Sequence, residues 1–196
     1  MFMPANKYQG FTLIELVVGM VAFSIALVLF TSLIVPQAKK SVDPIFQVRA
    51  AELGQSLMNE VLAKSFDEES NRVGGSLRCN DKDDDDNVIQ ACTTSDKLGD
   101  DGESRDNYDD VDDYDGFTAA NSDIKNALNE DITLDGSTIY SGFSVSVTVV
   151  YDDDMDGIDN LLESGSDDPG NTKLITVTVT TPNDEDIIFS AYRSNF

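Results

Sequence analysis

An aspartate-rich segment in the C-terminal third of the chain has the residue types and spacing of a calcium-binding loop. In the stretch that starts at Asp152, carboxylates stand at the first, third and fifth places, Gly157 at the sixth and Glu163 at the twelfth. Calcium takes several oxygen ligands, and this register lets alternate side chains converge while the glycine turns the backbone sharply. The expected ligands are Asp152, Asp154, Asp156, the carbonyl oxygen of Ile158, Asn160 and Glu163.

This loop is a single copy, and strand-like segments rather than helices flank it. Because EF-hand loops lie between two helices, a plain acidic hairpin loop remains the alternative. The string also resembles the calcium loops of thrombospondin type 3 repeats, which bind the ion without paired EF helices. We therefore predict a Ca²⁺ ion that holds the loop together, since its carboxylates repel one another without a cation.

A second carboxylate stands at the start of an uncharged run. Glu15 precedes residues 16–35, which contain no charged side chain. At about 1.5 Å per residue, a helix of this length spans about 30 Å, the hydrocarbon thickness of a bilayer. A carboxylate at the membrane edge needs a cationic partner, and the nearest basic residue is Lys7. The pattern predicts a membrane-spanning helix with a functional acid at its start.

The residues around Glu15 resemble the class III signal of type IV prepilins and of type II secretion pseudopilins. The string is QGFTLIE at 9–15, followed by the apolar run. The resemblance implies cleavage after Gly10 by a prepilin peptidase and methylation of the new amino terminus at Phe11. It also implies that Glu15 pairs with the terminal amine of a neighbouring subunit. A single-pass anchor that carries this string by accident is the alternative.

As a member of that family, the chain would be a minor pilin that takes part in assembling a type IV pilus. It would cross the inner membrane once, hold its C-terminal part in the periplasm, and later join a pilus on the cell surface. Its partners would be the prepilin peptidase, the inner membrane, other major and minor pilins and the pilus assembly platform. Two other functions remain open: a minor pseudopilin of a type II secretion system, and a calcium-stabilised adhesin subunit of a pilus.

Three further strings carry narrower resemblances. RDNYDDVDDY at 105–114 and KLGD at 97–100, with the spacing of Cys79 and Cys92, resemble the D-type minor pilins of the mannose-sensitive haemagglutinin pilus. RAAELGQSLMNEV at 49–61 resembles the helix of PilV-type minor pilins and of I-type pseudopilins.

Cys79 and Cys92 are the only cysteines, and the chain has no histidine. Two cysteines alone do not complete a zinc site. In the periplasm that the resemblance implies, the two are expected to form a disulfide. Two free thiols, or pairing with another protein, are the alternatives.

A one-sided helix is predicted over 45–66, where apolar residues recur every three or four positions. Glu60 and Lys64 are expected to form an ion pair on its other face. The following segment, 66–131, holds 21 acidic residues against 6 basic ones and reads as a solvated loop or a disordered segment. Within it, a short helix is predicted over 122–129. The acidic run at 108–116 is expected to be a solvated loop, and a calcium-assisted turn is the alternative, although the run lacks a clean ligand register.

The C-terminal third predicts an antiparallel sheet with one wet face. Apolar and hydroxyl-bearing residues alternate over 143–149 and 174–180, a third strand follows at 187–192, and a further one begins at 132–134. The apolar face needs a cover, and the helix at 45–66 is the natural candidate. The predicted fold class is α+β, with a long N-terminal helix packed on an antiparallel sheet through a long acidic connection.

The expected organisation follows in chain order: a leader peptide at 1–10, the transmembrane half of the helix at 11–35, and its amphipathic half at 36–66. An acidic loop region with the disulfide occupies 67–131, and the sheet with its aspartate-rich loop occupies 132–196. A net charge of −24 argues against nucleic-acid binding, which needs a basic face. The absence of histidine removes Ser-His-Asp and Cys-His nucleophiles, and no phosphate-binding loop is present, so we predict that the chain is not an enzyme.

Overall fold

The computed structural model describes residues 10, 12–40, 43–70 and 78–195. The chain divides into two compact units, Met1–Pro44 and Ile45–Phe196, and we call the second unit the head. Most of the expected leader peptide and the expected methylation site, Phe11, lie outside the described residues.

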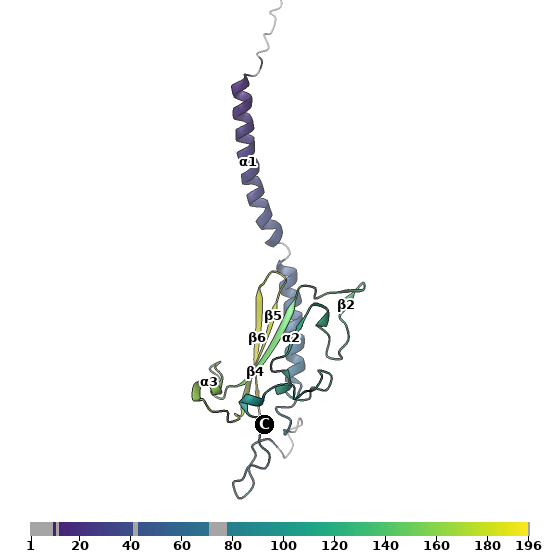
Figure 1. Ribbon diagram of the computed structural model, residues 1–196, viewed down its shortest axis with the longest axis vertical. Helices are drawn as coiled ribbons and strands as arrows, with labels where there is room; N and C mark the ends of the chain where they lie inside the picture. The colour runs from purple at the N-terminus through teal and green to yellow at the C-terminus, as the bar shows by residue number, and fades with distance from the viewer. Residues whose placement is uncertain (1–9, 11, 41–42, 71–77, 196) are drawn as a thin grey trace, which may run out of the picture. The chain divides into compact units, whose positions relative to one another are not determined.

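The N-terminal unit contains helix α1 (Leu13–Lys40), which continues through Pro36 (Figure 1). Its segment Leu13–Ser32 has a mean hydropathy of 2.6, and none of it is buried. The hydroxyls of Ser24 and Thr31 donate hydrogen bonds of 2.8 and 2.9 Å to carbonyl oxygens one turn earlier, so they add little polar surface. Among the described residues, α1 is the one helix long and apolar enough to cross a membrane.

The head is built on a four-stranded antiparallel sheet with the strand order β1-β4-β5-β6. The strands are β1 (Thr118–Ala120), β4 (Ser144–Tyr151), β5 (Thr172–Thr180) and β6 (Asp186–Ser194). The register aligns Val147 of β4 with Val177 of β5, and Val177 with Phe189 of β6. Two short strands, β2 (Thr133–Leu134) and β3 (Ser137–Thr138), form a separate pair. The three strands predicted after residue 140 are present, and the segment at 132–134 pairs outside the main sheet.

Side-chain alternation gives this sheet one buried and one wet face. The inward residues of β4 and β5 are almost all β-branched and buried, namely Val145, Val147, Val149, Ile175, Val177 and Val179. Most of their neighbours along each strand are serine or threonine on the opposite face, and the exceptions are Val150 and the buried Leu174. The predicted wet face is confirmed.

Helix α2 (Asp43–Leu62) covers the buried face, as the sequence predicts. Its apolar stripe packs into the core, with the ring of Phe46 set edge-on against Phe143 at a centroid distance of 5.8 Å. A Cβ atom on Gly54 would lie 2.2 Å from the ring of Phe189, so glycine at this point allows the helix to approach β6 closely. The fold is therefore α+β, and that prediction is confirmed.

The acidic run at 108–116 is not the solvated loop that was expected. Tyr108, Val111 and Tyr114 are buried in the same core as α2 and the sheet, and Asp110 and the short 3₁₀ helix η2 (Asp112–Tyr114) are buried with them. The prediction fails because the run carries an apolar residue at every third position, and these residues draw the aspartates between them into the interior.

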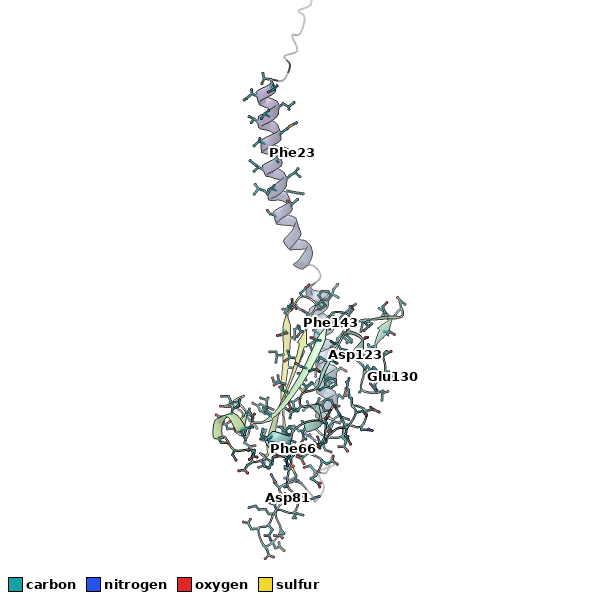
Figure 2. All side chains as sticks on the ribbon, in the orientation of Figure 1. Phe23, Phe66, Asp81, Asp123, Glu130 and Phe143 are labelled. Atoms are coloured by element: carbon teal, nitrogen blue, oxygen red, sulfur yellow. A yellow bond between two sulfur atoms is a disulfide. The ribbon has the colours of Figure 1, made fainter. Side chains whose placement is uncertain are left out.

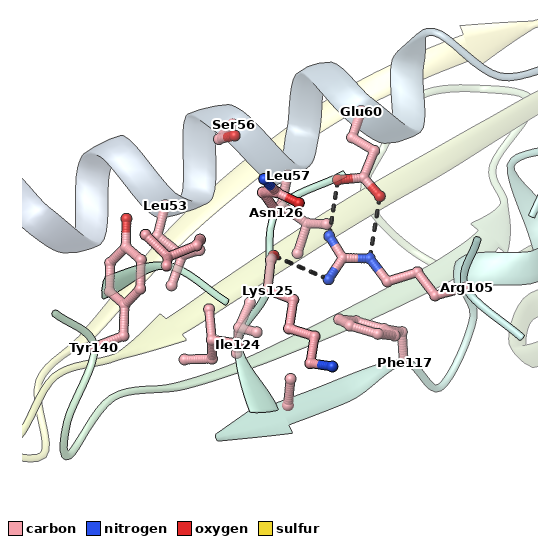
Figure 3. A pocket seen from close by; sticks show the side chains of 13 residues that line it. Leu53, Ser56, Leu57, Glu60, Arg105, Phe117, Ile124, Lys125, Asn126 and Tyr140 are labelled. Carbon is pink, nitrogen blue, oxygen red and sulfur yellow. Dashed lines mark hydrogen bonds and ion pairs between the residues drawn. The ribbon is translucent and has the colours of Figure 1, made fainter. Parts of the chain in front are cut away.

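The predicted ion pair between Glu60 and Lys64 is also wrong. The carboxylate of Glu60 accepts hydrogen bonds of 3.1 and 2.8 Å from the guanidinium of Arg105, as Figure 3 shows, and one of 2.9 Å from the hydroxyl of Tyr114. Arg105 also lies over the ring of Phe117, at 5.0 Å from its centroid. Lys64 instead donates to the backbone carbonyl of Tyr108. Glu60 of α2 and Lys64, just after the helix, therefore both hold the acidic segment against the end of α2.

The helix predicted over 122–129 is replaced by a 3₁₀ turn, η3 (Asn121–Asp123), and a tight hairpin. The side-chain oxygen of Asn126 accepts hydrogen bonds of 2.9 Å from the backbone of both Leu128 and Glu130. Asn129 has a left-handed backbone, with φ at 59°. Asparagine that bonds to its own backbone in this way competes with helix formation.

Two further short helices complete the described head, η1 (Ser95–Lys97) and α3 (Asn160–Ser164). A disulfide joins Cys79 and Cys92, and both cysteines are buried beside Phe66 and Tyr151. Figure 2 labels Asp81 in the loop that this disulfide closes.

Candidate functional site

The start of α1 carries the residues that the sequence singles out for processing and assembly. Gly10 is exposed, and no atom lies within 4 Å of the place a Cβ would take. Thr12 stands at the helix start, where its hydroxyl accepts a hydrogen bond of 3.4 Å from the backbone N–H of Glu15. Glu15 lies in the first turn, where a carboxylate interacts favourably with the helix dipole. Phe11 lies outside the described residues, so the structure does not place it.

No Lys or Arg among the described residues forms an ion pair with Glu15, which is exposed. The apolar side chains that follow are exposed as well. Phe23, labelled on α1 in Figure 2, is one of them, and it is 66% exposed. A surface of this kind is stable only when lipid or other apolar helices cover it.

The aspartate-rich loop between β4 and β5 brings three of its expected ligands together. Asp152, Asp154 and Asp156 each offer a carboxylate oxygen, and these oxygens all lie within 4.8 Å of one another. Asp152 is fully buried, and its carboxylate accepts hydrogen bonds from the backbone of Asp156 at 3.1 Å and of Gly157 at 2.8 Å. The loop thus curls around the first carboxylate of the predicted register.

Local backbone geometry closes the rest of the loop. Gly157 has φ at 89°, the left-handed region that the sharp turn requires. Asp159 caps α3 by accepting a hydrogen bond of 3.0 Å from the backbone of Leu161. Helix α3 carries Glu163, whose pKa is raised chiefly by the charge of Asp156 and also by those of Asp154 and Asp152.

The remaining expected ligands lie on the same loop. Asn160 accepts a hydrogen bond of 3.2 Å from the backbone of Asp153, so its side-chain oxygen faces the loop. Asp154, Asn160 and Glu163 line one open surface hollow, through which solvent reaches the carboxylates. For the carbonyl of Ile158, no contact in the described residues supports or opposes a ligand role. Such a set of hard oxygens could hold a divalent cation.

Tyr192 and Asp153 support this loop, and the sequence did not indicate either role. The hydroxyl of Tyr192, on β6, donates a hydrogen bond of 2.8 Å to the carboxylate of Asp152. Burial opposes ionisation of Asp152, but the hydrogen bonds from Tyr192 and the loop backbone outweigh it and lower the pKa. The carboxylate of Asp153 accepts hydrogen bonds of 2.8 Å from the backbone of both Asn171 and Thr172, which ties the loop to the start of β5.

A buried lysine network is the other feature that sequence reasoning missed. Lys173 is fully buried, and its ammonium donates to the carboxylate of Asp112 at 2.8 Å and to the carbonyl of Phe66 at 2.7 Å. A carboxylate oxygen of Asp67 lies 3.5 Å away, and the ring of Tyr151 covers the ammonium at 5.2 Å. The signal was present in the sequence, because Lys173 is in phase with the inward residues of β5.

The comparisons with known proteins concern the N-terminal segment. Residues 5–31 match the family model described as the prokaryotic N-terminal methylation motif. No curated protein and no solved structure matches the chain, so the narrower resemblance to D-type minor pilins gains no support. The motif implies processing by a prepilin peptidase and association with the membrane, and it indicates a structural subunit rather than an enzyme. Residues 5–31 therefore carry a methylation motif of the type IV pilin type, and this motif supports a type IV pilin-like or pseudopilin-like protein.

Proposed function

We propose that this chain is a minor pilin that takes part in the assembly of a type IV pilus, as an initiating, tip or shaft subunit. One observation carries the proposal: a methylation motif opens directly into a helix that is apolar on all sides and places Glu15 in its first turn. Cleavage after Gly10 would free the amino group of Phe11. The apolar helix would then move from the membrane into the core of a filament, together with the helices of other pilins.

Glu15 has a specific role in this proposal. Its carboxylate lacks an ion-pair partner in the described residues, and an uncompensated charge is costly in an apolar filament core. The terminal amine of a neighbouring subunit would supply the cation and set the register between the two helices. The acidic head would lie at the filament surface or tip. Of the known pili, the mannose-sensitive haemagglutinin pilus is the one that the string at 105–114 favours.

The experiment is a Glu15→Val substitution in the native host. We expect leader cleavage to remain intact and incorporation into sheared filaments to be lost. The matched control is Glu52→Val, which removes an exposed carboxylate from α2 and should leave incorporation unchanged. Normal incorporation of the Glu15→Val chain would refute the amine-pairing role.

A deletion in the same host separates the pilus from a type II secretion system. Loss of surface filaments with normal release of exoproteins is the expected result. Intact filaments with exoproteins trapped in the periplasm would make the chain a minor pseudopilin. Intact filaments with lost attachment would make it an adhesin subunit.

We also propose that the aspartate-rich loop binds Ca²⁺ as a structural ion. The proposal is supported by the convergence of Asp152, Asp154 and Asp156 within 4.8 Å and by the charge coupling of Glu163 to all three. Six acidic residues stand between positions 152 and 163, most of them exposed, and they repel one another, so a divalent cation would remove that repulsion. The ion would stabilise the head rather than act as a signal.

Thermal unfolding of the full chain in detergent tests the calcium proposal. At a free calcium concentration about 100-fold above its dissociation constant, the ion would add about 2.7 kcal/mol, a shift of several degrees in Tm. Asp154→Asn with Glu163→Gln should abolish the shift. Asp84→Asn with Asp85→Asn, a matched loss of two exposed acids in another loop, should preserve it. A shift that survives the first pair would exclude this loop as the site.

A further inference from the structure

The buried ammonium of Lys173 lies against a carboxylate with which its nitrogen could form a covalent bond. The Nζ atom of Lys173, on β5, is 2.8 Å from an Oδ atom of Asp112, on the 3₁₀ helix η2. An amine attacks a carboxyl carbon only in its neutral form, and water normally prevents this by keeping both groups charged. Here 0% and 4% of the two side-chain surfaces are exposed, so solvent does not reach the pair.

Aromatic rings and one backbone carbonyl surround the ammonium. The ring centroids of Phe66, labelled in Figure 2, and Tyr151 lie 4.5 and 5.2 Å from the Nζ atom. The carbonyl oxygen of Phe66 accepts a hydrogen bond of 2.7 Å from the same atom. Apolar surroundings raise the free energy of charged groups relative to their neutral forms. The site therefore favours the neutral amine and the neutral acid from which an amide can form.

Asp110 can supply a proton to the carboxyl group of Asp112. The side chain of Asp110 is buried and shares a hydrogen bond with that of Asp112, and burial together with this bond raises the pKa of Asp110 to about 9. Asp110 therefore holds a proton at neutral pH. When an amine attacks the carboxyl carbon, negative charge develops on the carboxyl oxygens. A protonated side chain that already bonds to such an oxygen is placed to act as a general acid.

Asp67 can accept a proton from the ammonium. An Oδ atom of its buried side chain lies 3.5 Å from the Nζ atom of Lys173. The backbone N–H of Thr93 donates a hydrogen bond of 2.8 Å to the same Oδ atom, which fixes its position. A nucleophile, an electrophilic carboxyl group, an acid and a base therefore meet in one water-free place.

We propose that Lys173 and Asp112 react with each other to form an intramolecular amide, with Asp110 as the general acid and Asp67 as the general base. The ion pair in the structure is the state that precedes this bond. The amide would join η2 to β5 across 61 positions of the sequence. It would hold the acidic segment 108–116 to the sheet even in an unfolded chain, because denaturants do not break amides.

Atoms and protons balance in this reaction. Asp67 takes one proton from the ammonium, and the freed lone pair of the Nζ atom bonds to the Cγ atom of Asp112 while Asp110 protonates one carboxylate oxygen. The electrons on the other oxygen re-form the C=O bond. The protonated oxygen takes the proton from Asp67 and leaves as water. The nitrogen then returns one proton to Asp110, so both acids regain their starting states and no oxidant or reductant is needed.

The test is the mass of the purified full chain in detergent, and it does not depend on the proposed function. The chain is made without a prepilin peptidase, shown to unfold cooperatively, and then reduced. We expect a mass about 18 Da below that of the sequence, from the loss of one water. Trypsin does not cut after an acylated lysine, so residues 106–125 and 126–193 should appear as one linked fragment.

An internal control shows whether distance alone is enough. Lys82 lies 3.0 Å from Asp86, but the two side chains are 53% and 84% exposed, so solvent keeps both charged. This pair should stay unlinked in the same digest. A folded chain with the full mass of its sequence would overturn the proposal. So would a lost water without the linked fragment, because an aspartate that cyclises on its own backbone loses the same mass.

Two variants test the role of Asp110. Asp110→Asn cannot give up a carboxyl proton, so the linked fraction of the purified chain should fall about tenfold or more. The matched control is Asp113→Asn, in a neighbouring buried acid whose carboxylate accepts hydrogen bonds from the backbone of Asp109 and Asp110. The amide oxygen can keep these bonds, so this variant should stay linked. Equal linking of the two folded variants would overturn the role assigned to Asp110.

Discussion

Two aspartate-rich segments of similar composition lie in opposite environments in the head. Residues 108–116 read YDDVDDYDG and are mostly buried, whereas residues 152–159 read DDDMDGID and are mostly exposed. The first segment has Tyr108, Val111 and Tyr114 at intervals of three, and all three enter the core. The apolar residues of the second, Met155 and Ile158, remain exposed. Aspartate content therefore does not decide exposure; the apolar residues between the aspartates do.

The two segments also neutralise their carboxylates by different means. In the buried segment, Asp112 accepts a hydrogen bond from the ammonium of Lys173, and burial, reinforced by the hydrogen bond that protonated Asp110 donates to Asp112, raises the pKa of Asp110 to about 9. In the exposed loop, backbone N–H groups and the hydroxyl of Tyr192 stabilise Asp152 as a carboxylate, and no basic side chain of the described residues pairs with the loop. Residues 108–116 thus neutralise their carboxylates with a lysine and a bound proton, whereas residues 152–159 keep their negative charge.

The largest effect is expected from removing the cation of the buried segment. Lys173→Met keeps an unbranched apolar side chain but leaves the carboxylates of Asp67 and Asp112 buried without their partner. Breaking a buried pair in this way costs about 3–5 kcal/mol. We expect that loss in the free energy of unfolding, measured with guanidinium chloride on the full chain in detergent at neutral pH.

The matched control uses a lysine in an exposed acidic loop. Lys82 lies 3.0 Å from Asp86, but the two side chains are 53% and 84% exposed. Solvent screens such a pair, so Lys82→Met should cost less than about 0.5 kcal/mol. If Lys173→Met cost no more than this control, the network would not be what holds the buried segment.

The next effect is a dependence of stability on pH. Asp110 has a folded pKa of about 9 against an ordinary value of 3.8, with Asp112, Asp113 and Lys173 as its charged neighbours. Because the folded state holds this proton more tightly than the unfolded state, the contribution is fully present below pH 4 and is lost as the pH rises through about 9. We expect this group to make the unfolding free energy fall between pH 5 and pH 8, by about 1.4 kcal/mol per pH unit at most.

Asp110→Asn isolates this contribution. The amide cannot lose a proton, so the decline between pH 5 and pH 8 should flatten, while the titrations of Asp113 and Asp115, whose pKa values burial also raises, continue. Urea unfolding at several pH values measures the slope. A slope as steep in the variant as in the native chain would place the pH dependence elsewhere.

Periodic segments of this molecule could be predicted, and segments that depend on distant partners could not. The expected helix at 45–66 corresponds to α2, and the alternating segments after residue 140 correspond to β4, β5 and β6, because each pattern repeats with the period of its own element. The three-residue strand β1 was missed. Its existence depends on pairing with Ser144–Ser146 rather than on a pattern of its own.

The same division applies to the sites. The register from Asp152 to Glu163 lies within one loop, so the convergence of Asp152, Asp154 and Asp156 could be predicted from the local sequence. An ion pair between Glu60 and Lys64 was predicted because the local sequence shows only that the two residues are four positions apart on a helix. The partner that it has in the structure, Arg105, comes from a segment that reaches α2 only in the folded head. Lys173 could have been recognised as inward from the phase of β5, but its acceptors could not.

The smallest effect concerns how the exposed loop is held. Met155 has φ at 62° and is 55% exposed, so it adopts a left-handed backbone without packing in return. Met155→Gly should relieve about 1–2 kcal/mol of strain and lose about 0.4–1 kcal/mol through the freer unfolded chain, a net gain of about 0.5 kcal/mol. Ile158 lies in the same loop, but its φ is not positive, so Ile158→Gly relieves no strain. This substitution should therefore only lower the free energy of unfolding, through the freer unfolded chain. Urea unfolding without calcium should show that Met155→Gly raises the free energy of unfolding and that Ile158→Gly lowers it. A change of the same sign in both variants would mean that turn geometry does not hold the loop.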